Sequence, residues 1–121
     1  MGGRVAPARA ISRTFDAPDQ RKIVTRDDAI RELGSCEAEI RAHGAKSLYL
    51  FGSTSRDEST AMSDVDLFID YDLDAHFNAF DLVEIKDLIE RRLHRSVDLT
   101  TRDGLHPRLR QKIEREAIQV F

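Results

Sequence analysis

Two aspartates placed two positions apart are the residues of this sequence that most directly suggest chemistry. Asp64 and Asp66 begin a segment, residues 64–71, in which apolar and polar side chains alternate. Because successive side chains of a β-strand point to opposite faces, both carboxylates project from one face, about 6–7 Å apart. Like charges held that close repel each other unless a cation lies between them. Hard oxygen donors without a neighbouring His or Cys favour Mg²⁺ or Mn²⁺ over zinc, so the pair indicates a site for one of these cations.

A third aspartate and a glycine–serine pair extend this pattern. Asp98 lies in residues 96–100, a further short strand segment, at the same phase, and can complete a triad of carboxylates. Such a triad fits two metal ions about 3.5–4 Å apart, which activate one oxygen and stabilise a phosphoryl centre. Gly52 lets the backbone approach a phosphate closely, and the amide and hydroxyl of Ser53 can donate to its oxygens. A Gly-Ser pair alone is an ordinary turn, but beside the aspartates it indicates a triphosphate site that faces a metal site.

The other charged residues near this pattern have simpler explanations. Arg56 is balanced between a phosphate contact and a salt bridge with Asp57 or Glu58. Asp70 and Asp72 stand at the end of the strand and are expected to face solvent. Residues without metal-ligand spacing, expected on the surface or at helix caps, are His43, His76, His94 and His106.

Length and composition describe one small domain. The chain has 121 residues, enough for a single core. Lys and Arg number 19 against 22 Asp and Glu, a net charge of −3, so direct nucleic-acid binding is not expected. The apolar runs fall short of the ~18 residues that a membrane span needs. The lone Cys36 fits a core position on a helix and cannot form an intramolecular disulfide, which favours a cytoplasmic location.

The elements that must position these residues alternate between helices and strands. Residues 1–24 contain two prolines and lack apolar periodicity, so a poorly ordered arm is expected before a domain over residues 25–121. Thr25 resembles a capping-box residue that opens a helix ending near Gly44. The apolar end, residues 117–121, is expected to pack on the core or on a partner. The order αββαβα predicts an α/β (α+β) fold with one small mixed sheet backed by helices. The expected strands are 47–51, 64–71 and 96–100, and the expected loop is 54–63. The later helices are expected over residues 80–93 and from Pro107 onward, with Leu109 and Ile113 as the apolar positions of the last helix.

The spacing of these motifs resembles that of a known family. Gly52-Ser53, ten residues and then Asp64-Val65-Asp66 is similar to the G-S-x10-D-x-D pattern of the polymerase-beta-like nucleotidyltransferase superfamily. The similarity is greatest to its minimal nucleotidyltransferases, called MNT domains, and covers about residues 25–121, including residues 96–100 as the third-carboxylate strand. The sequence departs from the family pattern at Asp57, where a glycine is common, and this places a negative charge near the expected phosphates.

This resemblance implies an enzyme that moves a nucleoside monophosphate, in the first instance AMP from ATP, to an acceptor hydroxyl and releases pyrophosphate. Asp64 and Asp66 would hold two Mg²⁺ ions, with Mn²⁺ as a substitute. Asp98 would complete the acceptor-side metal and help to remove the hydroxyl proton. The nucleotide-binding residues would be Gly52, Ser53 and Arg56.

The resemblance also implies a partner, because a domain this small cannot enclose an acceptor. MNT domains of this size are similar to antitoxins that adenylylate a tyrosine of a HEPN-type ribonuclease toxin. The expected partner is therefore a HEPN toxin or a second copy of the chain, and the segments least explained by the core are the arm and residues 118–121. Two alternatives stay open: a non-catalytic antitoxin or binding module that acts by contact, and a nucleotidyltransferase for small molecules, similar to the aminoglycoside enzymes.

Overall fold

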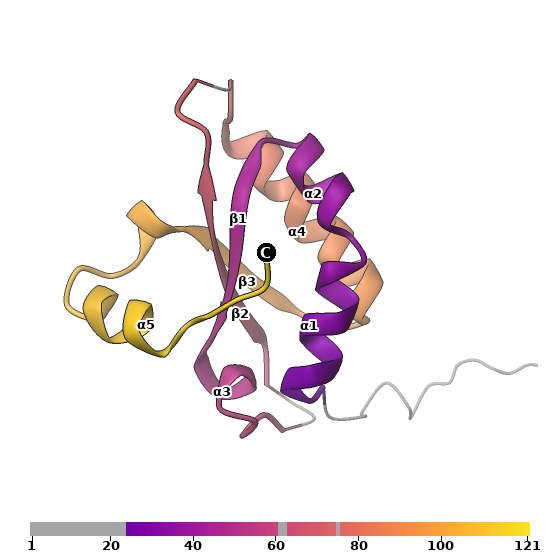
Figure 1. Cartoon of the computed structure of the whole chain (residues 1–121), viewed down its shortest axis with the longest axis vertical. Helices are drawn as coiled ribbons and strands as arrows, with labels where there is room; N and C mark the ends of the chain where they lie inside the picture. The colour runs from indigo at the N-terminus through magenta and orange to yellow at the C-terminus, as the bar shows by residue number, and fades with distance from the viewer. Residues whose placement is uncertain (1–23, 61–62, 75) are drawn as a thin grey trace, which may run out of the picture.

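A mixed β-sheet joins the segments on which the aspartates stand (Figure 1). The computed structural model describes residues 24–60, 63–74 and 76–121. Within these ranges the strands are β1 (Ala45–Phe51), β2 (Val65–Tyr71), β3 (Val97–Thr101) and β4 (Ile118–Gln119). β1 pairs antiparallel with β2 and β4, and β2 pairs parallel with β3, which gives the order β3-β2-β1-β4. The expected α/β fold with one small mixed sheet is confirmed.

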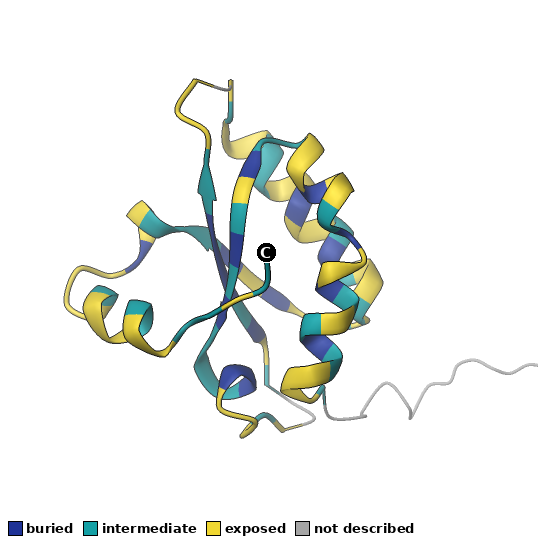
Figure 2. Ribbon diagram, in the orientation of Figure 1, coloured by how far each residue is buried: buried dark blue, intermediate teal, exposed yellow. Residues whose placement is uncertain are grey.

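Helices cover the two faces of this sheet unequally (Figure 1). On one face lie α1 (Arg26–Gly34), α2 (Glu37–Ala42) and α4 (Ala79–Leu93), and on the other side lies α5 (Arg110–Glu116). The short α3 (Gly52–Ser55) follows β1, and the 3₁₀ helix η3 (Arg102–Gly104) follows β3. Buried residues lie on the strands and on the first group of helices (Figure 2), and they form one hydrophobic core. Fully buried members of this core are Leu33, Ile40, Leu48, Leu50, Leu67, Ile85 and Ile89.

Alternation along β2 assigns its side chains to opposite faces, as the sequence predicts. Val65, Leu67 and Ile69 belong to the core beneath the helices. Phe68 is also fully buried, although it points to the opposite face, because its ring stacks on Tyr49 with centroids 4.7 Å apart. We call this second face, which carries Asp66, Phe68 and Asp70 of β2, the α5 face.

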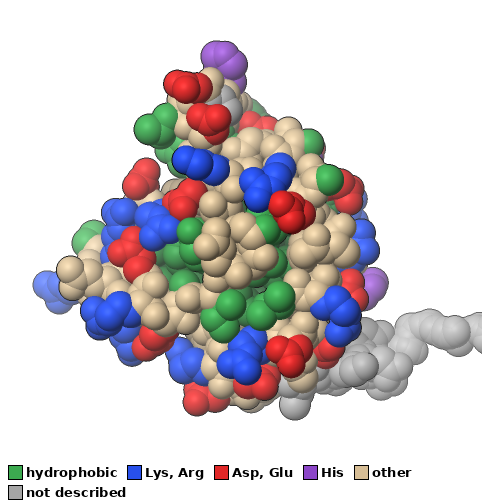
Figure 3. All heavy atoms as spheres, viewed as in Figure 1, with side chains coloured by type: hydrophobic (Ala, Val, Ile, Leu, Met, Phe, Trp, Pro, Cys, Tyr) green, Lys and Arg blue, Asp and Glu red, His purple; other side chains and the backbone are tan. Residues whose placement is uncertain are grey.

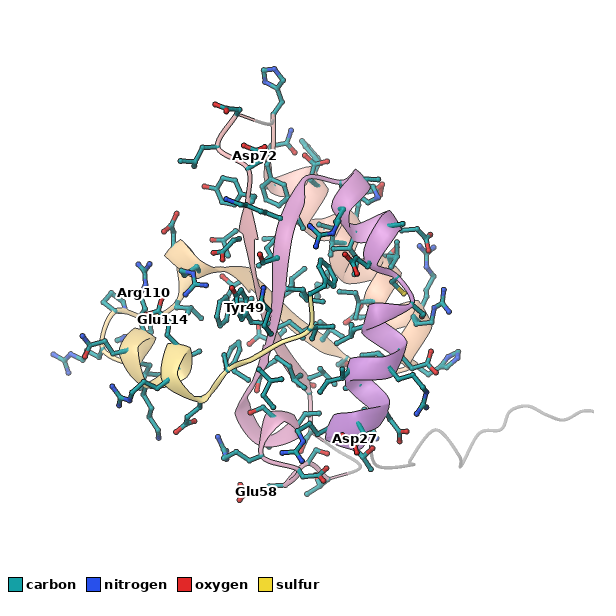
Figure 4. All side chains as sticks on the ribbon, in the orientation of Figure 1. Asp27, Tyr49, Glu58, Asp72, Arg110 and Glu114 are labelled. Carbon is teal, nitrogen blue, oxygen red and sulfur yellow. The ribbon has the colours of Figure 1, made fainter. Side chains whose placement is uncertain are left out.

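Arg102 ties α5 to the α5 face of the sheet. Its Nε and Nη2 donate to the two carboxylate oxygens of Asp70 at 2.8 and 2.9 Å, and its Nη1 donates to Glu114 Oε2 at 2.7 Å. The guanidinium also lies 4.9 Å from the centroid of the Phe68 ring and 5.0 Å from that of Tyr49. Figure 4 shows Glu114 and the neighbouring Arg110 on α5, on the side where Tyr49 lies. Bidentate pairing and cation–π contact together hold the two elements in one arrangement.

The expectation that Asp70 faces solvent is therefore wrong, because Arg102, from a later part of the chain, covers it. Asp72 is exposed as expected, and its carboxylate accepts a hydrogen bond from the amide of Asp74 at 2.9 Å. A strand end that is expected to face solvent on local grounds becomes half-buried when a segment from elsewhere in the chain folds over it.

The first helical segment differs from expectation in its length. Thr25 caps α1 as predicted, with its hydroxyl accepting from the Asp28 amide at 3.1 Å. A single helix as far as Gly44 is wrong, because α1 ends at Gly34 and α2 begins at Glu37. Glycine, serine and cysteine, which occupy positions 34–36, are weaker helix formers than the residues around them. Cys36 is buried in the core, as expected.

Two further segments depart from the expected boundaries. The polar loop expected over residues 54–63 begins with part of α3, in which Thr54 and Ser55 are buried. The last helix begins only at Arg110, and Leu109 lies in the turn before it with half of its surface exposed, so its assignment to the apolar face of that helix is wrong. That turn is closed by the Leu109 amide, which donates to the carbonyl of His106 at 2.9 Å.

The N-terminal arm expected over residues 1–24 lies outside the described residues, except for Val24. The boundary between arm and domain thus stays a prediction. Among the described residues, we find no helix with the length and apolar character of a membrane span.

The C-terminal residues complete the sheet instead of being left over from the core. Strand β4 pairs with β1, and the Val120 amide donates to the Leu48 carbonyl at 2.8 Å. The Leu48 amide in turn donates to the Phe121 carbonyl at 3.1 Å, and the Arg41 guanidinium lies 4.8 Å from the centroid of the Phe121 ring. Packing of the apolar end on the core is confirmed, and a contact between this end and a partner stays a prediction. β4 could not be predicted from the sequence, because a two-residue strand has too few positions for alternation to be visible.

Replacement of Phe121 by alanine is expected to lower the free energy of unfolding by about 1–3 kcal/mol, because the half-buried ring loses its packing and its contact with Arg41. Chemical denaturation followed by circular dichroism measures the change. Leu73→Ala is the matched control, since this apolar side chain is 86% exposed and its loss should leave stability unchanged. Equal stability of the two variants would contradict the packing of the C-terminus.

Candidate functional site

The parallel pairing of β2 and β3 brings two of the predicted carboxylates together. Asp66 and Asp98 are direct partners in the register, so their side chains leave the sheet on the same face. Asp64 directly precedes β2 and is exposed, as is Asp98, whereas Asp66 is half-buried. The predicted triad therefore stands along one end of the α5 face.

The pKa of Asp66 reports how close the charges around it lie. Burial, together with the negative charges of Asp98 and Asp64, raises this pKa to about 6, and the positive charge of Arg56 opposes the rise. The charges of Asp98, Asp64 and Arg56 therefore all act electrostatically on the Asp66 carboxyl at this end of the face. A divalent cation would relieve the repulsion among the carboxylates, and their oxygens are the donors that Mg²⁺ and Mn²⁺ prefer. Among the described residues, no group of three His, Cys, Asp or Glu side chains is placed so that it could hold a metal ion, so convergence of the three aspartates on one ion stays a prediction.

Gly52 adjoins these carboxylates because β1 pairs with β2. Phe51 is the register partner of Asp66, and Gly52, the next residue, starts α3 with a φ of +75°. A Cβ atom at this position would collide with Asp66 Oδ2. Glycine is thus required here both by the left-handed backbone and by the close approach of the carboxylate.

Ser53 lies half-buried in the first turn of α3, next to the carboxylates. Its carbonyl accepts hydrogen bonds from the amides of Arg56 at 3.2 Å and Glu58 at 2.8 Å, which fold the chain back over α3. None of the described residues forms a hydrogen bond with the Ser53 hydroxyl. The hydroxyl can therefore donate to an anionic oxygen that enters the site.

Arg56 adopts the salt-bridge alternative in this structure. Its Nε donates to Glu58 Oε1 at 2.9 Å, and its Nη1 donates to Glu116 Oε1 at 3.3 Å. Asp57, the other acidic partner considered from the sequence, instead accepts from the amide of Arg26 at 3.0 Å. Glu116 could not be found from the sequence, because it lies on α5, far from Arg56 along the chain, and no local pattern joins the two.

Comparisons with known proteins point to one family. A sequence model of the family described as nucleotidyltransferase domain matches residues 33–120. A Methanocaldococcus jannaschii protein that carries the name protein adenylyltransferase is 35% identical over 79 residues, which are 65% of this chain and 83% of that protein.

Solved structures lead to the same family. A protein described as a minimal nucleotidyltransferase is 33% identical, with a TM-score of 0.62, and the match covers 77% of this chain and 89% of that one. A chain from the complex of a tri-AMPylated Shewanella oneidensis HEPN toxin with an MNT antitoxin shares the fold at 18% identity and a TM-score of 0.54, over 76% of this chain and 71% of that one.

Replacement of Gly52 by alanine is expected to lower the free energy of unfolding by about 2 kcal/mol, because a left-handed backbone is costly for any residue with a Cβ and the new atom would displace Asp66. Gly34→Ala is the matched control, since a Cβ there meets nothing within 4 Å and alanine favours a helix. Thermal melting of both variants tests this expectation, and a G52A variant as stable as G34A would contradict the close approach.

The raised pKa of Asp66 predicts a stability that depends on pH. Because the pKa is about 6 in the folded protein against 3.8 for an ordinary aspartate, the folded chain retains a proton that the unfolded chain has released between these values. Stability therefore falls as pH rises through this range. We expect Asp66→Asn to be more stable than the parent by about 1 kcal/mol above pH 7, a value reduced by solvent screening, and equally stable near pH 4.

Urea denaturation in a chelating buffer at several pH values measures this difference. Asp72→Asn, at an exposed position beyond the other end of β2, is the control and should follow the parent at each pH. A D66N variant less stable than the parent at pH 7.5 would show that this carboxylate supports the fold.

Proposed function

The chain belongs to the nucleotidyltransferase domain family, and on this premise we propose that it transfers AMP from ATP to an acceptor hydroxyl and releases pyrophosphate, in a reaction that depends on Mg²⁺. The observation that carries the proposal is the register pairing of Asp66 with Asp98 at the point where β1 delivers Gly52 and Ser53. The carboxylates and the residues that would donate hydrogen bonds to the phosphates thus lie at one end of the sheet, as phosphoryl transfer requires.

The proposed metal ligands are Asp64, Asp66 and Asp98, which would hold two Mg²⁺ or Mn²⁺ ions. The chemistry these cations supply when bound is neutralisation of the phosphates and an easier loss of the acceptor's hydroxyl proton. What supports the assignment is the oxygen-only donor set, together with the burial and the neighbouring negative charges that raise the pKa of Asp66.

The remaining residues would bind the nucleotide and orient the transfer. Ser53 and the first turn of α3 would donate hydrogen bonds to the β and γ phosphates, and Gly52 leaves room for them beside Asp66. Arg56 would neutralise part of the triphosphate charge. Asp98, at the exposed side of the site, would take the proton from the acceptor hydroxyl as its oxygen bonds to the α-phosphorus, while the bond from that phosphorus to pyrophosphate breaks.

We propose that the acceptor is a tyrosine of a HEPN-type toxin. The carboxylates lie at an open end of the sheet, so the acceptor can be presented by another chain. The names of the relatives support a protein acceptor: the Methanocaldococcus jannaschii protein is called a protein adenylyltransferase, and the Shewanella oneidensis toxin in the MNT complex is AMPylated. AMP on a tyrosine would add negative charge and bulk to a surface that must accept RNA, and so block cleavage.

The experiment is incubation of the chain with labelled ATP and Mg²⁺, alone and with the product of the adjacent gene as the candidate partner. We expect transfer of label to the partner, with mass spectrometry locating AMP on a tyrosine. The double replacement Asp64→Asn and Asp66→Asn should reduce both transfer and Mg²⁺-dependent nucleotide binding to background, because the carboxylates that would hold the cations are lost. The pKa of Asp66 also predicts that binding weakens below about pH 6, since a bound proton competes with the cation.

Asp72→Asn is the matched control, because it removes an exposed carboxylate from the same strand region and should keep full activity. A partner that is neutralised without modification would favour the non-catalytic antitoxin. Label that appears only on an added aminoglycoside would favour the small-molecule enzyme.

A further inference from the structure

The guanidinium of Arg56, which is proposed to bind the triphosphate, already forms ion pairs with two carboxylates. Arg56 donates through Nε to Glu58 and through Nη1 to Glu116, at 2.9 and 3.3 Å. Its positive charge also acts on Asp66, and its contact with Glu116 joins it to the end of α5. Figure 3 shows positive and negative side chains next to one another over α5. An incoming phosphate must therefore compete with carboxylates that already hold this cation.

The two contacts of Arg56 differ in how readily a phosphate could replace them. Glu58 is two residues away, in the same turn, and binds at the shorter distance. Glu116 belongs to α5, and α5 is fixed to the sheet separately, through the bond between Arg102 and Glu114. A phosphate that binds bidentately to Nη1 and Nη2 would displace Glu116 and leave Glu58 on Nε.

Glu116 gains little from its own helix. It is the last residue of α5, where the exposed carbonyls of the helix end disfavour a negative charge. More than a third of its side chain is exposed, so water can solvate the carboxylate once Arg56 has left it. The pairing with Arg56 explains why a glutamate stands at this helix end. When a phosphate replaces Glu116 on Arg56, the freed carboxylate is solvated and no charge is buried.

We propose that Glu116 is a positioning residue that holds Arg56 at the rim of the site in the nucleotide-free protein and gives it up to a terminal phosphate of ATP. This inference rests on the proposed nucleotidyl transfer. It assigns α5 a role in nucleotide affinity, although none of the predicted site residues lies on that helix. A carboxylate that must be displaced lowers the affinity for the triphosphate, so its removal should raise that affinity.

The test is the dissociation constant of Mg²⁺ with a non-hydrolysable ATP analogue, measured by calorimetry for the parent and for Glu116→Gln. We expect the variant to bind about two- to fivefold more tightly, the range of an exposed ion pair, and to change less in its affinity for AMP. Asp87→Asn is the charge-matched control, because this carboxylate is exposed on α4 and should leave binding unchanged.

A double-mutant cycle separates the pair from a general effect of charge. In an Arg56→Gln background, Glu116→Gln should no longer change the affinity. Weaker or unchanged binding by E116Q alone, or a gain that persists without Arg56, overturns the inference and leaves the proposed function standing. A purely structural tie between α3 and α5 would instead lower the melting temperature of E116Q without tightening nucleotide binding. A parent protein that does not bind the analogue with Mg²⁺ overturns both proposals.

Discussion

The alternation of side chains along β2 is the constraint on which the rest of this structure depends. Val65, Leu67 and Ile69 fill the core beneath the helices, while Asp66 and Asp70 emerge on the α5 face. A shift of the strand by one residue would bury the carboxylates and expose the aliphatic side chains, at a cost that no local adjustment could offset. Because the core fixes this register, it also fixes which residues can meet at the candidate site.

The α5 face is held together by charge where the helical face is held together by apolar packing. Arg102 covers the stacked rings of Tyr49 and Phe68 and binds carboxylates from β2 and α5. Because Arg102 is half-buried, water and salt screen its ion pairs less than they screen ion pairs at the surface. This arrangement closes the middle of the face and leaves the end beside α3 open, where Gly52 adjoins Asp66 and Asp66 pairs in register with Asp98.

Electrostatic interactions at that open end destabilise the folded protein when no ligand is bound. Burial and two neighbouring negative charges disfavour the ionised form of Asp66, and Arg56, the cation that opposes them among the described residues, is shared with Glu58 and Glu116. An arrangement of this kind is costly unless positive charge enters with a ligand. A nucleotide with divalent cations would supply it, which is why the same geometry that destabilises the free domain suits the proposed reaction.

The sequence by itself determined the first three strands, the cap of the first helix and the face shared by the aspartates, because alternation and turn chemistry act over a few neighbouring residues. It also led, through the Gly-Ser and Asp-Val-Asp spacing, to a family that the comparisons confirm, while the metal and phosphate roles of these residues stay predictions. Only the tertiary structure decided that Arg102 covers Asp70, that Arg56 meets Glu116, and that the C-terminus forms a fourth strand. These contacts join residues 32 and 60 positions apart, or pair a segment too short to show a period. Their geometry follows from how helices and sheet pack, which no local pattern encodes.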